Sequence, residues 1–442
     1  MGTNQPGTEK WAFHPNNSWG ESSPTVADGI VYVGSRDMHL YAVDANTGTK
    51  QWAFQTDHRV SSSPTVVNGT VYVGSSDNHL YAVGANTGTK QWAFQTDRKV
   101  RSSPTVVDGT VYIGSCDGHL YAVDANTGTK QWAFQTHNGG YKTDDMVDSS
   151  PTVVNGTVYV GSRDHHLYAV DANTGTQQWA FQTDSYVYSS PTVADGIVYV
   201  GSRDNHLYAV DANTGTQQWA FQTDHWVDSS PTVADGIVYV GSRDHQLYAV
   251  DANTGTQQWA LQTGDFVISS PTVADETVYV GSKDQHFYAV DVSTGTKQWA
   301  FQTVGFVKSS PTAVDGTVYI GSGNHLYAIH AEGTASSNGS RVLLGTLNHH
   351  ESRQDHRNRP VRDEQATTPS ATDLCSSCRK DLSEYDDVEF CPECGSKIDT
   401  KVYQPCPRCG SNLPDSADAA FCPDCGIELE INRDLYTKIY DP

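Results

Sequence analysis

Eight of the nine cysteines stand in four Cys-x-x-Cys pairs late in the chain. The pairs are Cys375 and Cys378, Cys391 and Cys394, Cys406 and Cys409, and Cys422 and Cys425. Twelve residues separate the first pair from the second, and twelve separate the third from the fourth. Two such turns on facing hairpins present four thiolates to one ion, which is the tetrahedral donor set of a structural zinc site. The spacing therefore predicts two closed metal sites with no open position for catalysis.

Two other chemistries are open to these cysteines. Disulfides are one, but evenly spaced Cys-x-x-Cys pairs in a cytosolic chain favour a metal. Iron in a rubredoxin-like site is the rival metal. Glycine follows three of the four pairs, at Gly395, Gly410 and Gly426, where a tight turn favours a residue that tolerates positive φ. The pattern resembles the double-zinc-ribbon family, which implies two structural zinc ions in residues 374–430 and a fold that depends on them.

The segments on either side of this module have a different composition. Residues 331–373 are rich in Ser, Asn, His, Arg, Asp and Thr, with one short apolar patch at Val342–Leu344. Such a stretch predicts a flexible polar linker. Its histidines, His349, His350 and His356, could bind metal, but scattered histidines in a linker are usually solvated. Residues 431–442 are expected to form a short tail.

A Ser-Ser-Pro motif recurs eight times before the linker, with proline at positions 24, 64, 104, 151, 191, 231, 271 and 311. The step is 40 residues except once, where an insert within His137–Asp148 lengthens it to 47. A period near 40 is typical of propellers and helical solenoids. Val, Tyr, Ile and Thr fill each unit, and Asp-Gly or Asn-Gly turns punctuate it, so the repeats predict a β-propeller.

The unit Ser189–Thr223 contains four predicted strands. Strand A is Ser-Ser-Pro-Thr-Val, strand B is Ile197–Gly201, strand C is His206–Val210 and strand D is Gln218–Thr223. Only seven of the eight units are followed by a D strand with its Trp-Ala-Phe or Trp-Ala-Leu signature, and the missing copy is at Gly7–Phe13. We therefore expect an all-β fold over residues 7–330, an eight-bladed propeller that the N-terminal strand closes, leaving no free sheet edge.

The string Leu207–Trp219 and its copies, Leu-Tyr-Ala-Val-Asp-Ala-Asn-Thr-Gly-Thr-x-x-Trp, resemble the repeat of the pyrroloquinoline-quinone (PQQ)-like β-propellers. That family includes quinoprotein dehydrogenases and also non-enzymatic assembly scaffolds, so the resemblance implies the fold more than the function. Its dehydrogenases have a central Ca²⁺, a catalytic Asp and often adjacent cysteines. Here no two cysteines are adjacent and the blades are nearly identical. We expect no enzymatic activity and no bound PQQ.

Three further patterns could hold a metal or react, and each has a simpler interpretation. Histidine recurs at one repeat position, but propeller symmetry spreads these side chains over a ring too wide for one ion. The Asp44–Gly48 loop is similar to half of a calcium loop, yet Gln55 stands where the last acidic ligand belongs, and an Asx turn explains it equally well. Cys116 is interpreted as an incidental unpaired thiol.

The link from strand D to the next strand A changes in every copy, whereas the strands hardly change. The B–C turn varies as well, at Met38, Asn78, Gly118, His165, Asn205, His245 and Gln285. In a propeller both segments emerge on one face, and exposed aromatic and arginine side chains carry much of the contact energy in interfaces. We therefore expect a ligand-binding face that includes Trp19, Arg59, Arg101, Tyr186, Tyr188, Trp226, Phe266 and Phe306. The alternative is that the links have drifted, although drift favours small polar residues.

The formal net charge is -23, which disfavours binding to nucleic acid or an anionic membrane. An excess of Asp is typical of proteins from extreme halophiles, so we expect a haloarchaeal source. The first residues contain no apolar run and no stretch approaches ~20 apolar residues. We expect a cytoplasmic monomer, with export open if an upstream signal has been lost.

These patterns together predict a non-enzymatic scaffold. The propeller face would bind a protein or peptide, and the zinc ribbon would mediate a second interaction, as in a sensor of biological conflict. The alternative is an enzyme similar to the PQQ-dependent dehydrogenases.

Overall fold

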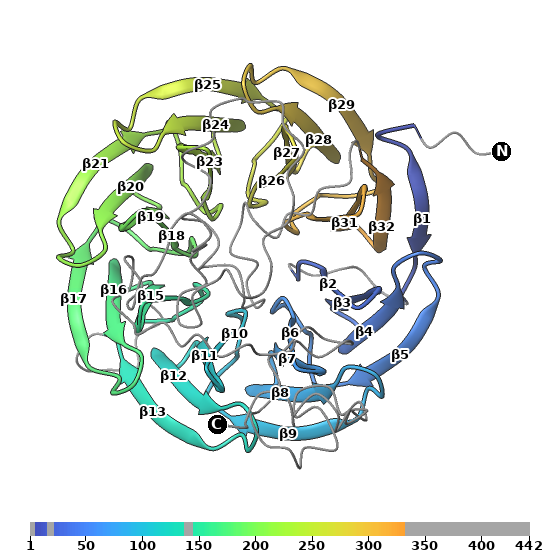
Figure 1. Ribbon diagram of the computed structural model, residues 1–442, viewed down its shortest axis with the longest axis vertical. Coiled ribbons are helices and arrows are strands. Elements are labelled where there is room, and N and C mark those ends of the chain that lie inside the picture. The colour runs from blue at the N-terminus through green and yellow to red at the C-terminus, as the bar shows by residue number, and fades with distance from the viewer. Residues whose placement is uncertain (1–4, 16–21, 137–144, 332–442) are drawn as a thin grey trace, which may run out of the picture. The chain divides into compact units, whose positions relative to one another are not determined.

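The computed structural model describes residues 5–15, 22–136 and 145–331. All of them belong to the first of two units into which the chain divides, Met1–Arg357. The predicted linker from residue 332 onward, the eight paired cysteines and Trp19 lie outside the described residues. The described part forms eight four-stranded antiparallel sheets arranged as the blades of a ring, which confirms the all-β, eight-bladed propeller (Figure 1). It contains no helix that could cross a lipid bilayer.

The two inner strands of each blade, A and B, lie nearest the propeller axis (Figure 1). The A strands of blades one to eight are β2 (Thr25–Ala27), β6 (Thr65–Val67), β10 (Thr105–Val107), β14 (Thr152–Val154), β18 (Thr192–Ala194), β22 (Thr232–Ala234), β26 (Thr272–Ala274) and β30 (Thr312–Val314). The B strands are β3 (Ile30–Gly34), β7 (Thr70–Gly74), β11 (Thr110–Gly114), β15 (Thr157–Gly161), β19 (Ile197–Gly201), β23 (Ile237–Gly241), β27 (Thr277–Gly281) and β31 (Thr317–Ser322).

The two outer strands, C and D, complete each blade. The C strands are β4 (His39–Asp44), β8 (His79–Gly84), β12 (His119–Asp124), β16 (His166–Asp171), β20 (His206–Asp211), β24 (Gln246–Asp251), β28 (His286–Asp291) and β32 (His325–His330). The D strands are β5 (Lys50–Gln55), β9 (Lys90–Gln95), β13 (Lys130–Gln135), β17 (Gln177–Gln182), β21 (Gln217–Gln222), β25 (Gln257–Gln262), β29 (Lys297–Gln302) and, in blade eight, β1 (Glu9–Phe13). Strands B and C are buried along most of their length, which suits sheets covered on both faces.

Strand A is shorter than the sequence predicted, because the Ser-Ser-Pro residues precede the strand instead of starting it. In blade five the Ser190 N–H donates to the Ser230 hydroxyl of the next blade over 2.9 Å. The Thr192 hydroxyl donates to the Pro231 carbonyl over 2.6 Å. Both bonds recur at all eight junctions, so hydrogen bonds join the blades in a closed ring near the axis. Proline has no N–H to give a ladder, so it is tolerated here, before the strand.

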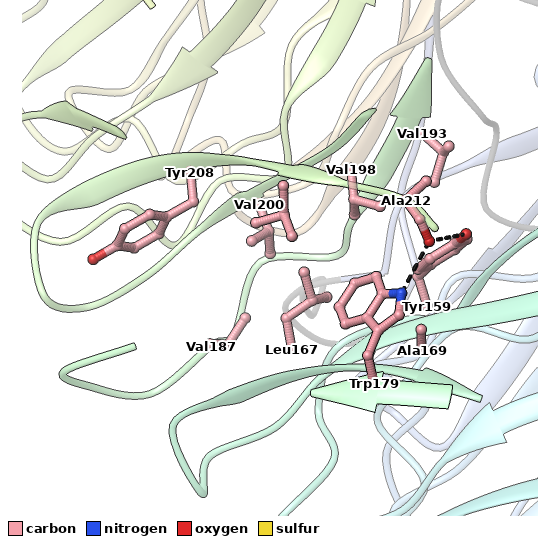
Figure 2. Packing of buried hydrophobic residues seen from close by; sticks show 11 residues of the cluster. Tyr159, Leu167, Ala169, Trp179, Val187, Val193, Val198, Val200, Tyr208 and Ala212 are labelled. Carbon is pink, nitrogen blue, oxygen red and sulfur yellow. Dashed lines mark hydrogen bonds between the residues drawn. The ribbon is translucent and has the colours of Figure 1, made fainter. Parts of the chain in front are cut away.

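Neighbouring blades pack through a repeated hydrophobic cluster (Figure 2). Trp179 of β17 is buried against blade five, and its indole N–H donates to the Ala212 carbonyl over 2.9 Å. The Tyr159 hydroxyl donates to the same carbonyl over 3.1 Å. Val198 and Val200 of β19 are fully buried in the same cluster. Full burial of one such side chain contributes about 1.5–3 kcal/mol. A cluster of this kind lies at each of the eight junctions.

The N-terminal strand closes the ring, as the sequence predicted. β1 pairs antiparallel with β32, with Trp11 opposite Ala328 and Phe13 opposite Leu326. The Trp11 indole N–H donates to the Ala45 carbonyl of blade one over 3.0 Å, which repeats the contact seen at Trp179. The first three strands of blade eight thus come from one end of the repeat array and the fourth comes from the other.

Candidate functional site

The D–A links and the B–C turns lie together on one face of the propeller, which we call the variable face. At blade four the Thr183 N–H donates to the His165 carbonyl over 2.8 Å. The Val187 N–H donates to the Ser162 carbonyl over 3.0 Å. The seven links from blade one to blade eight are bonded in the same way, each to the B–C turn of the blade that precedes it. The backbone of the variable face is therefore fixed, although its side chains differ from blade to blade.

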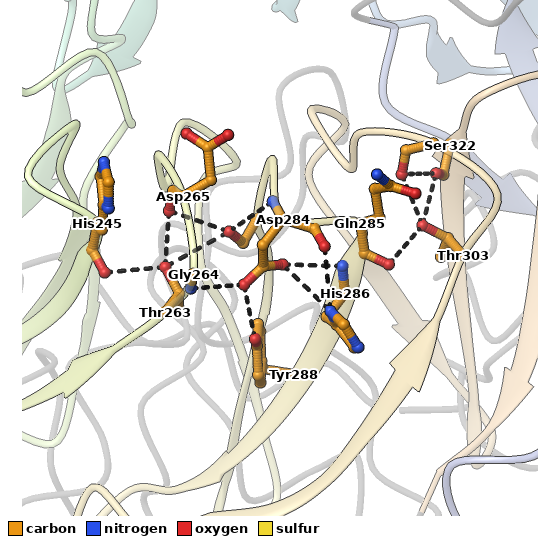
Figure 3. Close-up of polar contacts among 12 residues, drawn as sticks. His245, Thr263, Gly264, Asp265, Asp284, Gln285, His286, Tyr288, Thr303 and Ser322 are labelled. Atoms are coloured by element: carbon orange, nitrogen blue, oxygen red, sulfur yellow. Dashed lines mark hydrogen bonds and ion pairs between the residues drawn. The ribbon is translucent and has the colours of Figure 1, made fainter.

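An aspartate of the B–C turn supports the preceding link, as blade seven illustrates (Figure 3). The Asp284 carboxylate accepts bonds of 2.7 Å from the Gly264 N–H of the link and 2.7 Å from the Tyr288 hydroxyl. It also accepts a 2.9 Å bond from the His286 N–H. Because this carboxylate already has three donors, its role is to hold the link in place.

Aromatic and cationic side chains alternate along the variable face over blades four to eight. We call this series the cation–aromatic ladder, and its members are Arg163, Tyr188, Arg203, Trp226, Arg243, Phe266, Lys283 and Phe306. The Arg203 guanidinium carbon lies 3.8 Å from the Tyr188 ring centroid and 4.5 Å from the Trp226 ring centroid. A cation within about 6 Å of a ring centroid is attracted by the ring quadrupole. Cation–π contacts therefore hold the side chains of the ladder in place.

Two aspartates fix the arginines of the ladder. Asp228 accepts bonds from Arg203 and from Arg243, at 2.8 Å and 2.7 Å from the two Nε atoms. Asp148 accepts a 2.8 Å bond from the Nε of Arg163. Bidentate pairs of this kind are strong and directional. They orient the guanidinium planes, so the rings between them are held as well.

The exposed hydrophobic surface is concentrated on the variable face. Among the described residues, only three large hydrophobic side chains are exposed: Val304 at 60%, Phe306 at 50% and Met38 at 44%. Val304 and Phe306 belong to the link between blades seven and eight, and Met38 belongs to the B–C turn of blade one. The opposite face, formed by the A–B and C–D turns, carries no such side chain in the described ranges.

Several B–C turns carry side chains in a backbone conformation that favours glycine or asparagine. The φ angles are 68° at Met38, 73° at His165, 73° at His245 and 70° at Gln285. His165 lies 5.3 Å from Tyr186, and His245 lies 5.3 Å from Phe266, between ring centroids. A non-glycine residue in such a conformation costs of order 1 kcal/mol, so these side chains are retained despite a backbone penalty.

The structure brings most of the predicted face residues onto this surface. Tyr188, Trp226, Phe266 and Phe306 belong to the ladder, and Tyr186 stacks edge-on beside Tyr188 at 6.1 Å. Arg59 and Arg101 belong to the links before blades two and three but take no part in the ladder, and Trp19 falls outside the described residues. Arg101 is 3.9 Å from Asp148, and the Arg59 Nε has no hydrogen-bond partner among the described residues.

The four cations of the ladder are the residues of the candidate site that the sequence prediction missed. Arg163, Arg203, Arg243 and Lys283 stand at one repeat position that hardly varies over blades four to seven, so they look like part of the frame. A signal was present in the neighbouring blades. Ser76 and Cys116 replace the cation in blades two and three, and the two positions that flank the constant valine of the nearby links carry no aromatic side chain there.

The histidine ring and the Asp44-type loops are structural. The His166 Nδ1 lies 2.9 Å from the Asp164 carbonyl oxygen, and its ring stacks on Tyr168 at 5.5 Å. Asp211 accepts the Asn213 and Thr214 N–H groups at 3.0 Å and 2.8 Å, as an Asx turn does. Nowhere in the described ranges do three or more His, Cys, Asp or Glu side chains gather closely enough to hold a metal ion.

Cys116 is a buried thiol in the B–C turn of blade three. Its sulfur donates to the Asp148 carboxylate over 3.3 Å. Burial, together with the nearby Asp148 charge, raises the pKa of Cys116 to about 12. At neutral pH it is therefore a protonated, unreactive thiol, since the thiolate is the nucleophile.

These features define an eight-bladed β-propeller with one constant and one variable face, followed by a cysteine-rich module. The sequence profile described as outer membrane protein assembly factor BamB, a PQQ-like repeat family, matches residues 3–132, 116–229 and 224–372. The chain belongs to this family. A second profile, the double zinc ribbon, matches residues 375–426 and includes all eight paired cysteines. This match supports zinc as the metal of the module.

Solved structures share the propeller fold. BamB from Moraxella catarrhalis matches with a TM-score of 0.64 and 17% identity, over 73% of this chain and 99% of that one. The computationally designed Ika8 protein matches with 0.63 and 18%, over 73% of this chain and 100% of that one. A europium-containing methanol dehydrogenase matches with 0.63 and 16%, over 74% of this chain and 85% of that one. At this identity the similarity shows the fold alone. No curated protein sequence matches the chain.

Proposed function

We propose that the protein is a non-enzymatic scaffold whose variable face binds a protein or peptide. The observation that carries this proposal is the asymmetry between the two faces. All three exposed large hydrophobic side chains of the described residues, and the whole cation–aromatic ladder, lie on the variable face. Aromatic residues and arginine, held rigid before binding, are the typical anchors of protein interfaces.

The constant part of the structure supports the same proposal. Nearly identical blades give no single blade a distinctive set of polar side chains, whereas the links differ at each junction. The tolerated positive φ angles at His165 and His245 indicate that these side chains are worth a backbone penalty. We propose that the links and turns determine which partner binds, and that the strands only hold them.

The zinc ribbon has a separate role in this proposal. Four cysteinates around each ion leave no position for a substrate, so the module would be structural. We propose that it binds a second partner and that the protein joins two components, acting as a cytoplasmic monomer on proteins and not on nucleic acid or membrane. A role in conflict recognition would fit uniform blades with a variable face.

The alternative function is that of a quinone-dependent dehydrogenase. The similarity of the propeller to a methanol dehydrogenase favours it. The two functions are separated by adding PQQ and Ca²⁺ to the purified protein and measuring dye reduction with alcohols and sugars. Turnover, or quinone absorbance that remains with the protein after gel filtration, would overturn the scaffold proposal.

The binding proposal is tested by affinity capture from native cells at high salt, with the whole protein as bait. The variant Tyr186→Ala, Trp226→Ala, Phe266→Ala should lose its captured partner and keep its far-ultraviolet circular dichroism. A matched triple variant changes exposed asparagines of the opposite face, Asn126→Ala, Asn173→Ala and Asn213→Ala. Capture that survives the aromatic variant, or is lost equally in both, would show that the variable face is not the binding surface.

A further inference from the structure

We propose that Phe306 and the shortened B–C turn of blade eight form a site for one arginine or lysine side chain of the bound partner. This inference rests on the proposed function, because it assigns the chemistry that one part of the variable face recognises. It follows from the end of the cation–aromatic ladder, where the alternation of rings and cations stops.

Every other ring of the ladder lies between two cations. Tyr188 has Arg163 and Arg203 at 4.6 Å and 3.8 Å, measured to the ring centroid. Trp226 has Arg203 and Arg243 at 4.5 Å and 4.9 Å. Phe266 has Arg243 and Lys283 at 5.6 Å and 4.8 Å.

Among the described residues, Phe306 has a single cation, Lys283, at 5.3 Å. The cation that the repeat would place on its other side belongs to the B–C turn of blade eight. That turn reads Ser322-Gly323-Asn324, whereas blade seven has Ser282-Lys283-Asp284-Gln285. It is one residue shorter and contains no basic residue. Within the described part of the chain, the last ring of the ladder therefore lacks the second cation that each of the other rings has.

The backbone at this turn keeps the position open. Val307 forms a β-bridge with Ser322, which places Gly323 directly beside the link that carries Phe306. Gly323 has a φ of 60°, and a Cβ there would lie 2.9 Å from a methyl carbon of Val304. No side chain of the chain itself can stand at position 323 without displacing Val304. Phe306 and Val304 are 50% and 60% exposed.

The chemistry of the missing group identifies the occupant. A half-exposed ring with a vacant cation position attracts a guanidinium or an ammonium group. The net charge of -23 draws such a partner towards the protein and disfavours an acidic one. The aliphatic part of an arginine or lysine side chain would also pack on the exposed Val304, because such stems bury well on apolar surface.

The test measures binding of a fluorescein-labelled peptide, Gly-Ser-Arg-Gly-Ser-Arg-Gly, to the full chain by fluorescence polarisation. Matched peptides carry lysine, citrulline or leucine in place of arginine. We expect the arginine and lysine peptides to bind more tightly than the two neutral ones. Phe306→Ala should weaken the arginine peptide by roughly 2- to 30-fold, the range of one cation–π contact. Phe306→Trp should retain the binding, and Asn213→Ala on the opposite face is the control.

A second variant fills the site with an arginine of the chain itself. Replacing Gly323 and Asn324 by the Arg-Asp-Asn of blade five, residues 203–205, restores the full turn and supplies an internal guanidinium. This variant keeps Phe306 and should bind the arginine peptide as weakly as Phe306→Ala does. Its melting curve reports whether the graft is accommodated, and Phe306→Ala tests the site if it is not.

Three results would overturn the inference. The first is equal binding of the citrulline and arginine peptides, and the second is no effect of Phe306→Ala. The third is tighter peptide binding when the linker arginines Arg353, Arg357, Arg359 and Arg362 are changed to glutamine, which would make the chain its own occupant. The proposed function is tested separately, by the capture experiment. A partner that is lost with the triple aromatic variant but retained with Phe306→Ala would contradict this inference and leave the scaffold proposal intact.

Discussion

The guanidinium group of Arg203 donates two hydrogen bonds to the carboxylate of Asp228, of 2.8 Å and 3.2 Å. The side chains are 18% and 11% exposed, so this pair is largely removed from water. Asp228 also bonds Arg243, and it is thus the one anion shared by two cations of the ladder. The rings of Tyr188 and Trp226 are held by cations whose own positions depend on this carboxylate.

Loss of that carboxylate should destabilise the propeller. We expect Asp228→Ala to lower the free energy of unfolding by about 2–3 kcal/mol, because two largely buried guanidinium groups lose their acceptor. Urea unfolding measures the change. The control is Asp184→Ala, an exposed link residue, which should change the free energy by less than about 0.5 kcal/mol. Equal effects of the two substitutions would mean that Asp228 contributes no more than a surface charge.

Removal of the closing strand should destabilise the whole ring. Deleting residues 1–15 removes β1, exposes the edge of β32 and leaves the contact of Trp11 with Ala45 unmade. We expect a lower melting temperature, and the single substitution Trp11→Ala should cost about 3–5 kcal/mol on its own. Deleting residues 2–4 leaves β1 whole and serves as the control. An unchanged melting curve after the longer deletion would contradict the closure.

Measuring zinc content distinguishes the paired cysteines of the zinc ribbon, which should bind metal, from Cys116 of the propeller, which should not. Elemental analysis of the full chain should give about two zinc ions, with two thiolate pairs for each ion. Cys378→Ser should reduce the content to about one ion and Cys422→Ser should do the same. Cys116→Ser should leave it unchanged, because that buried thiol lies outside the paired pattern. Red, iron-loaded protein would identify the rival metal.

Buried tyrosines should make the propeller sensitive to alkali. Burial, with nearby aspartate charges, raises the pKa values of Tyr199, Tyr239 and Tyr319 to about 12, from an ordinary value of 10.0. The folded chain keeps these protons at a pH where the unfolded chain has released them. Stability is therefore fully present below pH 10 and falls as the pH rises towards about 12.

This prediction is checked by following tyrosinate absorbance and circular dichroism in the same titration. The late part of the absorbance change should coincide with unfolding. Tyr199→Phe should remove one tyrosine from that late part. Complete tyrosinate formation near pH 10 in a chain that is still folded would show that these hydroxyls are not protected.

The fold could be predicted from the sequence because the same strand pattern recurs eight times. One D strand stands at the N-terminal end of the array, away from the blade that lacks it. Gly7–Phe13 matches the D strands, and β1 indeed completes blade eight. The start of strand A could not be predicted in the same way. Ser190 and Thr192 use their hydrogen-bonding groups across the blade junction, and that geometry exists only after the ring has closed.

The site was predictable only in part. Variation in the links indicated Trp226 and Phe266, because a changing position in a constant repeat is visible in one sequence. Arg203 and Arg243 were missed because they belong to the constant part of the repeat. Their contact with the rings joins a B–C turn to a D–A link across 15 to 23 positions of sequence, and no local pattern encodes it.

The closure has one more consequence, which concerns the connectivity of the chain. The Gly7 N–H donates to the His330 carbonyl over 2.8 Å, so the two ends of the repeat array already meet as neighbours in a sheet. A short peptide could join them, and the chain could then be opened in any C–D turn, such as the one at Asn173 and Thr174. Each circular permutant would contain the same eight junctions. The same ring should therefore form whichever blade is synthesised first. Permutants also offer a way to move the zinc module to any junction of the ring.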